Sequence, residues 1–460
     1  MSRRRLEALC GSVAHKRDFT YDIPMRFTWG AEEIIPLDNA AIIYPPTLAR
    51  YNSHMFRLSM DLTIPVEGSR LLVALERVMT RFPYFSVSLH QGFFWYYLTN
   101  HHKKLSVYPE HAYPCAFLDR HHGANGYLFK VFWREDRIAV EIFHALCDGT
   151  GGLVFLKSLV AEYLRLSGIE IGEDPQIFRP GTPVGRGESD DSFQHFYKPL
   201  GSVMNREPAA FHYARFEEIS DRVQVISAQV GIADVKRLGT QYDCTITEYL
   251  VAELIDAFQR VQEQTVGSRK HYKPISISVP VNIRRVFDSD SMRNFTLFVT
   301  PRINPRLGYY EFEEIVQQVK FQIRGSVNIK SLSQQISRNV AGERNPLLRF
   351  APNILKGPVM KILSDSYGDK TYSTTISNIG EVKLPSGMRE VVKRADFYLS
   401  PSKSNKVSCS VVGVNGMMSI NFTNFLVKQT VIEREFLTAL VAKGIPVRIA
   451  DNRNPHVSGR

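Results

Sequence analysis

Residues 138–149, IAVEIFHALCDG, place a histidine at the end of an apolar run and an aspartate four residues later. The apolar residues of this run alternate as they would on one side of a strand, and His144 falls on that same side. A neutral imidazole has a pKa near neutrality, and one nitrogen can accept a proton while the other donates to an orienting acceptor. His144 is therefore a candidate general base at the mouth of a buried strand.

A tight turn leads from this strand through Asp148 into a glycine-rich segment. Gly149, Gly151 and Gly152 let the backbone bend and approach other segments closely, and Asp148 could cap a helix that starts near Gly151. The spacing alone also fits a core histidine bonded to a carbonyl, followed by an ordinary N-cap aspartate. We expect no metal site, because a metal would need further ligands than this pair supplies.

The elements that must position these residues follow from hydrophobic periodicity. Residues 127–133 and 138–144 predict a hairpin across the turn REDR, and residues 151–168 predict a helix that stops at Gly168. The other elements expected in this half are a helix in 70–82 ended by Pro83 and a hairpin of 85–89 with 93–98. The first half thus predicts a mixed sheet with helices packed on it.

The second half repeats the same kinds of element without an internal sequence repeat. Thr245 and Glu248 form a capping box ahead of a helical pattern, and Asn415-Gly416 marks a hairpin turn. The remaining expected elements are a strand in 274–285 that ends at Arg284 and Arg285, and helices in 312–323 and 430–444. Both halves therefore belong to the α/β or α+β class, with mixed sheets and packed helices.

The length of 460 residues favours two domains over one core. We expect a polar leader in 1–30, an N-terminal lobe in 31–180 and a C-terminal lobe in 216–460. A crossing segment in 181–215 would join them, overlapping the Pro-, Gly- and Ser-rich stretch 178–194.

Composition narrows the class of protein. No run approaches the length of a membrane span, and the basic N-terminus lacks the apolar region of a secretory signal. Five scattered cysteines without CxxC spacing argue against a disulfide framework or zinc site and favour a cytoplasmic location. The net charge of +11 is dispersed and comes with no nucleic-acid-binding motif, so we expect a solvated basic surface or a phosphorylated ligand rather than nucleic acid.

Three motifs occur in order along the chain: FHALCDGTGG, SVPVNIRRVF followed by RNF, and TTISNIGEVKLP. Together they resemble the chloramphenicol acetyltransferase-like superfamily, which includes BAHD-type acyltransferases, bacterial alcohol acetyltransferases and condensation domains of peptide synthetases. PLDNAAIIYPP and RFPYFSVSLHQGFFWYYL look most like the bacterial alcohol acetyltransferases, and the resemblance spans residues 35–445. It implies two similar α/β lobes with an active-site tunnel between them, which acyl-CoA and the acyl acceptor enter from opposite faces.

The resemblance also implies roles for the first two motifs. His144 would be the general base that takes the proton of an acceptor hydroxyl or amine as it attacks the thioester. Asp148 would be structural: it would point away from the substrate and pair with an arginine, for which Arg284 is the best match and Arg285 the second. Such a pair would fix the loop that aims the histidine.

The third motif, SNIG, would supply Ser377 and Asn378, beside Gly380, as donors to the oxyanion of a tetrahedral intermediate; a polar turn after a strand is the alternative. Condensation domains usually carry two adjacent histidines, whereas this chain has Phe143 before His144. That difference favours free acyl-CoA over carrier-bound substrates. The BAHD-type motif DFGWG is absent as well.

Basic residues crowd the segment after SNIG, and CoA carries several phosphate charges. Arg394 and Lys403 are candidates for contacting them, and a solvated loop is the alternative. The sequence thus predicts a monomeric acyltransferase that uses acyl-CoA as co-substrate, with no permanently bound cofactor. A condensation-type enzyme acting on carrier-bound substrates and a non-catalytic ligand-binding relative are the alternatives.

Overall fold

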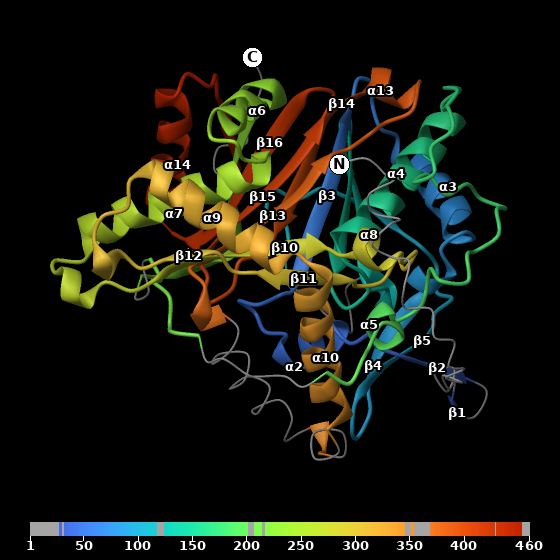
Figure 1. The fold of residues 1–460 in the computed structure, drawn as a ribbon. Coiled ribbons are helices and arrows are strands. Elements are labelled where there is room, and N and C mark those ends of the chain that lie inside the picture. Colours follow the sequence, from blue (N-terminus) through green and yellow to red (C-terminus); the bar gives the residue numbers. More distant parts are fainter. Residues whose placement is uncertain are drawn as a thin grey trace, which may run out of the picture.

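The computed structural model describes residues 27–29, 32–116, 124–200, 207–213, 217–345, 351–353, 369–427 and 429–452. They form two lobes, each with its own sheet, helices and apolar core (Figure 1). The predicted mixed α/β class with two lobes is confirmed. Most of the expected leader, 1–30, lies outside the described residues.

The first lobe is built on a five-stranded sheet with the order β14-β3-β8-β7-β6. Helices α3 and α4 pack against each other, and α4 also packs on β3 and β8. Because covered strands are buried on both faces, every residue of β3 is buried and the run around β8 reads as almost continuously apolar. The bounds are β3 (Met55–Leu62), α3 (Gly68–Met79), β6 (Val107–Pro109), β7 (Phe129–Arg134), β8 (Arg137–Phe143), α4 (Gly149–Leu166) and β14 (Val392–Leu399).

A smaller four-stranded sheet, β1-β2-β5-β4, lies at one end of this lobe (Figure 1). It contains the expected hairpin of β4 and β5, which pair antiparallel. The short helix α2 (Tyr44–Thr47) follows β2 along the chain. The bounds are β1 (Phe27–Trp29), β2 (Glu32–Pro36), β4 (Val87–Gln91) and β5 (Tyr96–Asn100).

The second lobe holds an eight-stranded sheet with the order β11-β10-β13-β15-β16-β9-β17, and β12 pairs beside β10. Helices α6, α7, α9 and α14 lie together on one side of it (Figure 1). The strands are β9 (Ile219–Gly231), β10 (Ile275–Asn282), β11 (Thr296–Val299), β12 (Arg302–Ile303), β13 (Thr374–Glu381), β15 (Val407–Val414), β16 (Met417–Leu426) and β17 (Arg448–Asp451). The helices are α6 (Ile232–Gln241), α7 (Ile246–Thr265), α8 (Arg284–Phe287), α9 (Phe312–Ser326), α10 (Ile329–Arg344) and α14 (Val431–Ala442). The short helix α13 (Met388–Val391) contributes Met388 and Val391 to the core of the first lobe.

Several local predictions are confirmed. Thr245 and Glu248 form both hydrogen bonds of the capping box at the start of α7. Asn415 and Gly416 turn the β15–β16 hairpin with φ of 50° and 76°, the left-handed values that a two-residue type I′ turn requires. Gly168 and Gly444 follow α4 and α14 with positive φ, as glycine commonly does after a helix.

Strand β14 joins the lobes, although it comes from the last quarter of the chain. It pairs antiparallel with β3 of the first lobe, while Ser410 and Asn421 of the second-lobe sheet donate side-chain hydrogen bonds to its Phe397 carbonyl. The sheet of the first lobe therefore contains residues 392–399 as well as residues from the first half of the chain. The expected crossing segment between the lobes at residues 181–215 stays a prediction. None of the helices in the described part of the chain has the length and apolar character of a membrane span.

Candidate active site

A cavity of about 2380 Å³ is lined by residues of both lobes. That exceeds the ~300–1,000 Å³ of common small-molecule pockets, so it has room for two substrates at once. Five of the predicted site residues line it, namely His144, Asp148, Gly149, Ser377 and Asn378. The structure therefore brings the HxxxDG and SNIG motifs to one space; the tunnel itself stays a prediction.

His144 follows the last residue of β8. Its Nδ1 lies 3.0 Å from Oδ1 of Asn294, and its backbone N–H donates to the His54 carbonyl at 2.9 Å. The rings of Tyr44 and Phe56 pack at 4.8 and 5.2 Å between centroids. Burial lowers the pKa of the imidazole by more than the charge of Asp148 raises it. The histidine is therefore neutral at pH 7 and able to accept a proton.

Asp148 forms the ion pair that the resemblance implied, with Arg284 and not Arg285. The two side chains make a bidentate contact at 2.8 and 3.0 Å, and both are buried. Burial alone would raise the pKa of the carboxyl, but Arg284 and the surrounding donors hold it below its usual range. Asp148 is thus an ionised carboxylate that faces the arginine.

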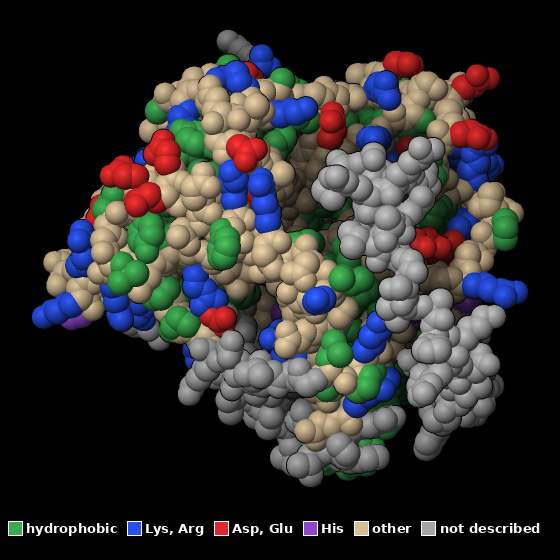
Figure 2. All heavy atoms as spheres, viewed as in Figure 1, with side chains coloured by type: hydrophobic (Ala, Val, Ile, Leu, Met, Phe, Trp, Pro, Cys, Tyr) green, Lys and Arg blue, Asp and Glu red, His purple; other side chains and the backbone are tan. Residues whose placement is uncertain are grey.

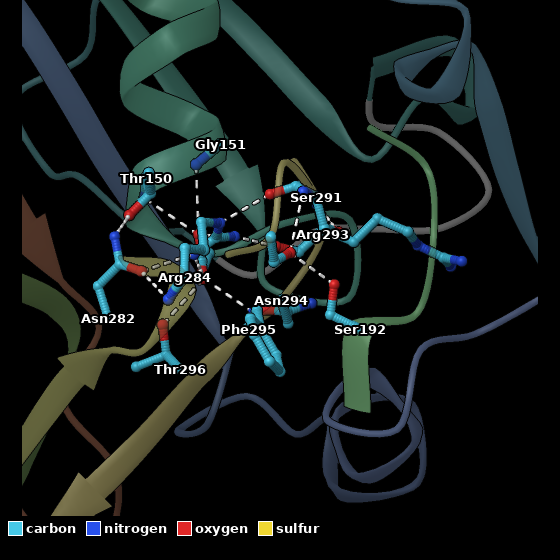
Figure 3. Close-up of polar contacts among 12 residues, drawn as sticks. Thr150, Gly151, Ser192, Asn282, Arg284, Ser291, Arg293, Asn294, Phe295 and Thr296 are labelled. Atoms are coloured by element: carbon cyan, nitrogen blue, oxygen red, sulfur yellow. Dashed lines mark hydrogen bonds and ion pairs between the residues drawn. The ribbon is translucent and has the colours of Figure 1, made fainter. Parts of the chain in front are cut away.

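The pair is held by further contacts from both lobes (Figure 3). Asp148 caps α4 through the N–H groups of Thr150 and Gly151, and it accepts from the Phe295 N–H and the Thr296 hydroxyl. Arg284, the first residue of α8, also donates to the carbonyl of Ser291 at 2.7 Å. These contacts tie the turn after His144 to the loop between β10 and β11.

The glycines of the motif differ in how tightly they are packed. A Cβ at Gly151 would lie 2.1 Å from the Met292 carbonyl, and one at Gly152 would lie 2.8 Å from the Phe56 ring. A Cβ at Gly149 would meet the side chains of Ile379 at 3.5 Å and Phe397 at 3.9 Å, both ordinary contacts. The close approach that the sequence suggested is therefore required at Gly151 and Gly152, while a side chain at Gly149 would make only ordinary van der Waals contacts.

Ser377 and Asn378 lie on β13. The Asn378 amide donates to the Thr247 hydroxyl at 3.0 Å, and its oxygen accepts from the Gly380 N–H at 2.8 Å. These bonds orient the amide and leave its second N–H available. The Ser377 hydroxyl has no hydrogen bond to any residue that the structure describes, so it too is available to a ligand.

The two residues expected to contact CoA phosphates are not at the cavity wall. Arg394, on β14, pairs with Asp396 at 2.9 Å and donates to the Ser227 hydroxyl, so its guanidinium is already neutralised. Lys403 is exposed, two residues from Asn405, which does line the cavity. The Lys and Arg side chains visible in Figure 2 are scattered rather than gathered in one patch. Phosphate binding by Arg394 or Lys403 stays a prediction.

Four further residues beside His144 had no role in the sequence interpretation: Asp38, Tyr44, His54 and Asn294. Asp38 and Tyr44 belong to the motif PLDNAAIIYPP, and Asn294 belongs to RNF. The presence of these residues in motifs was the one feature of the sequence that could have indicated a role for them. His54 lines the cavity, and its Nε2 lies 2.9 Å from the Thr47 hydroxyl. Burial lowers its pKa to about 3, so it too is neutral.

Among the described residues, no cluster of three or more His, Cys, Asp or Glu could hold a metal.

No protein-family model and no curated protein sequence matches the chain. Solved structures do match it. Polyketide synthase associated protein 5 from Mycobacterium tuberculosis is 14% identical with a TM-score of 0.56, and the match covers 88% of this chain and 96% of that one. Trichothecene 15-O-acetyltransferase from Fusarium sporotrichioides is 11% identical with a TM-score of 0.55, and the match covers 90% of this chain and 94% of that one.

The starter condensation domain of rhizomide synthetase, solved in complex with C8-CoA and Leu-SNAC, is 11% identical with a TM-score of 0.55. That match covers 89% of this chain and 94% of that one. At such identities the similarity is one of fold. The chain therefore has the fold of these acetyltransferase and condensation-domain structures, in agreement with the fold that the resemblance of its motifs implied.

Proposed function

We propose that the protein is a CoA-dependent acyltransferase that moves an acyl group from acyl-CoA to an alcohol or amine, with His144 as the general base. The observation that carries the proposal is the neutral imidazole of His144 on the wall of a cavity that both lobes line. Its Nδ1 is occupied by Asn294, so Nε2 is the nitrogen left for the substrate. An alcohol acceptor, as in the bacterial alcohol acetyltransferases, is the finer form of the proposal.

In the reaction, Nε2 of His144 accepts the proton of the acceptor hydroxyl or amine as its oxygen or nitrogen bonds to the thioester carbonyl carbon. The electron pair of the carbonyl moves to its oxygen. When the C=O bond forms again, the C–S bond breaks, and the imidazolium returns its proton to the CoA thiolate. A base in this role contributes about 10²–10⁴-fold to the rate.

The free N–H of Asn378 and the hydroxyl of Ser377 are the candidate donors to the oxyanion. Both residues lie on β13, and hydrogen bonds to Thr247 and Gly380 orient the Asn378 amide. Preorganised donors stabilise developing charge without reorganising during the reaction. Asp148 and Arg284 act on the rate indirectly, by fixing the turn that carries His144.

The donor distinguishes this proposal from its main alternative. Proteins with this fold include condensation domains, so a carrier-bound acyl group is the competing donor. Phe143 stands where a condensation domain usually has its first histidine, and it is buried rather than on the cavity wall. This favours free acyl-CoA.

The test is a screen of acyl-CoAs of different chain length against pooled alcohols and amines, followed by release of free CoA thiol. We expect acceptor-dependent release with wild-type protein and a loss of ~10²–10⁴-fold in kcat for His144→Ala, with little change in the KM of the donor. A His144→Ala variant that keeps more than about a tenth of the activity would exclude the general base. Turnover only with carrier-bound acyl groups would support the condensation-type alternative.

A further inference from the structure

Asn294 contacts His144 on two sides. Its Oδ1 lies 3.0 Å from Nδ1 of the imidazole, and its Nδ2 donates to the His144 backbone carbonyl, also at 3.0 Å. Asn294 stands in the loop before β11 and belongs to the second half of the chain, 150 residues from the histidine. The amide of Asn294, from the other half of the sequence, thus contacts both the ring and the backbone of the proposed base His144.

These contacts fix which way the amide faces. A backbone carbonyl can only accept, so the group of Asn294 that faces the His144 carbonyl must be the NH₂. Its oxygen then faces Nδ1 of His144, and an amide oxygen can only accept. Nδ1 must therefore carry the hydrogen, and in the neutral ring Nε2 carries the lone pair.

Asp38 holds the amide in this orientation. Its Oδ2 accepts from Asn294 Nδ2 at 3.0 Å, and its other oxygen accepts from the Ala41 N–H at 2.8 Å. The Asp38 side chain is fully buried, and the guanidinium of Arg293 lies 3.6 Å away. Asp38, Asn294 and His144 thus form one chain of hydrogen bonds that ends at the cavity.

We propose that Asn294, oriented by Asp38, is the positioning residue of His144: it selects the Nδ1–H tautomer and thereby turns the basic Nε2 toward the substrate. This inference deepens the proposed function and rests on it only for the consequence in catalysis. The acceptor that orients the imidazole is thus the amide of Asn294, while the carboxylate of the HxxxDG motif, Asp148, pairs with Arg284.

An amide in this place differs from a carboxylate in its charge and in its N–H donors, which the His144 carbonyl and Asp38 accept. Both offer an oxygen to Nδ1–H, but a carboxylate would add a negative charge beside the ring and so favour the protonated imidazole. The charged and titratable groups around His144 are Asp148, Asp38, His54 and Tyr44. Asn294 orients the base without adding to the charge of this set.

The test reads the tautomer without any substrate. In protein labelled with ¹⁵N-histidine, the His144 signals are assigned by their loss in His144→Ala. We expect a protonated Nδ1 and an unprotonated Nε2 in the wild-type protein. Asn294→Leu should give a mixture of tautomers. In Asn294→Asp a carboxyl oxygen replaces the Nδ2 that lies 3.0 Å from Asp38, so one carboxyl of this pair must hold a proton. The other oxygen of the new side chain still accepts from Nδ1, and this variant should keep Nδ1–H.

Kinetics then tests the consequence. A base misplaced by about 1 Å can cost ~10²-fold, so we expect that loss in kcat for Asn294→Leu and a partial rescue in Asn294→Asp. An Nε2–H tautomer in the wild-type protein, or an unchanged tautomer in Asn294→Leu, would overturn the inference. If Asn294→Leu fails to fold, the tautomer of Asn294→Asp decides, and loss of Nδ1–H in that variant would overturn the inference. Because the spectrum needs no turnover, a protein inactive with acyl-CoA would refute the proposed function and leave the positioning result readable.

Discussion

Two of the buried arginine–aspartate clusters in the described part of the chain lie in different places: one adjoins the cavity, and the other lies within the sheet of the first lobe. In the first, Arg284 alone neutralises Asp148, which lines the cavity beside His144. In the second, Arg394 and Arg137 both contact Asp396, and Arg137 also pairs with Asp61. The residues of this cluster come from the adjacent strands β14, β3 and β8.

The clusters share residue types and burial but differ in redundancy and in surroundings. Asp148 has one arginine, and it also caps a helix and contacts β11; Asp396 has two arginines. A charged pair in the interior is therefore no mark of an active site by itself. The neighbours of the pair determine whether its loss affects chemistry or only stability.

The largest expected effect comes from breaking the first cluster. Asp148→Asn and Arg284→Gln each leave a buried charge without its partner, which costs about 3–5 kcal/mol of unfolding free energy. Both should also lower kcat, because the turn that carries His144 loses its anchor. The double mutant should be less destabilised than the sum of the two singles, since the residues form one network.

Denaturant unfolding of the four proteins measures this coupling. Arg285→Gln is the matched control, because that neighbouring arginine is exposed and its loss should stay within about 0.5 kcal/mol. Additive losses in the cycle, or single mutants as stable as wild type, would show that the pair does not anchor the turn. Asp148 would then have to be considered as a direct participant in the reaction.

A smaller effect is expected in the second cluster. Arg394→Gln leaves Asp396 with Arg137 at 3.2 Å, so we expect a loss of only about 1–3 kcal/mol, as for a buried group that loses one partner. The kcat and the KM for acyl-CoA should not change. Thermal unfolding and steady-state kinetics give the two readouts. A KM raised severalfold without loss of stability would instead support the phosphate contact that the sequence suggested.

The pH dependence distinguishes the base from the clusters. Burial lowers the pKa of His144, and only its neutral form accepts a proton, so activity should persist as the pH falls below the usual value of about 6.5 and be lost at lower pH. His54 stays neutral down to about pH 3 and should not contribute. The pH profile of kcat/KM checks this, with His54→Asn as the control that should leave the midpoint in place. A midpoint above that of free histidine would contradict a desolvated base.

Sequence patterns predicted what depends on neighbours along the chain. The capping box at Thr245, the turn at Asn415-Gly416 and the glycine-rich start of α4 are local, and they were expected where the structure has them. The contact between His144 and Asn294 spans 150 residues and depends on how the lobes meet, which periodicity does not encode. The sequence also showed the charge of Arg394 but not its pairing with Asp396, because strand β14 crosses to the sheet of the other lobe.

The smallest expected effect concerns Lys403, the remaining candidate for a CoA phosphate. Unlike Arg394, it is exposed and has no ion pair with any described residue, and the neighbouring Ser402 and Asn405 line the cavity. A single exposed cation steers an anionic substrate weakly, and its field is screened within ~8–10 Å at physiological salt. Lys403→Gln should therefore raise the KM for acyl-CoA by about two- to fivefold at low ionic strength and much less in 0.5 M salt, with kcat and the melting temperature unchanged.

Steady-state kinetics at the two salt concentrations measures this change in KM. The control is Lys383→Gln, which removes the same charge from a residue outside the cavity lining. An equal rise in KM in both variants would show that the effect comes from the overall charge of the protein and not from Lys403 in particular. No rise in either variant would show that Lys403 does not contribute to CoA binding.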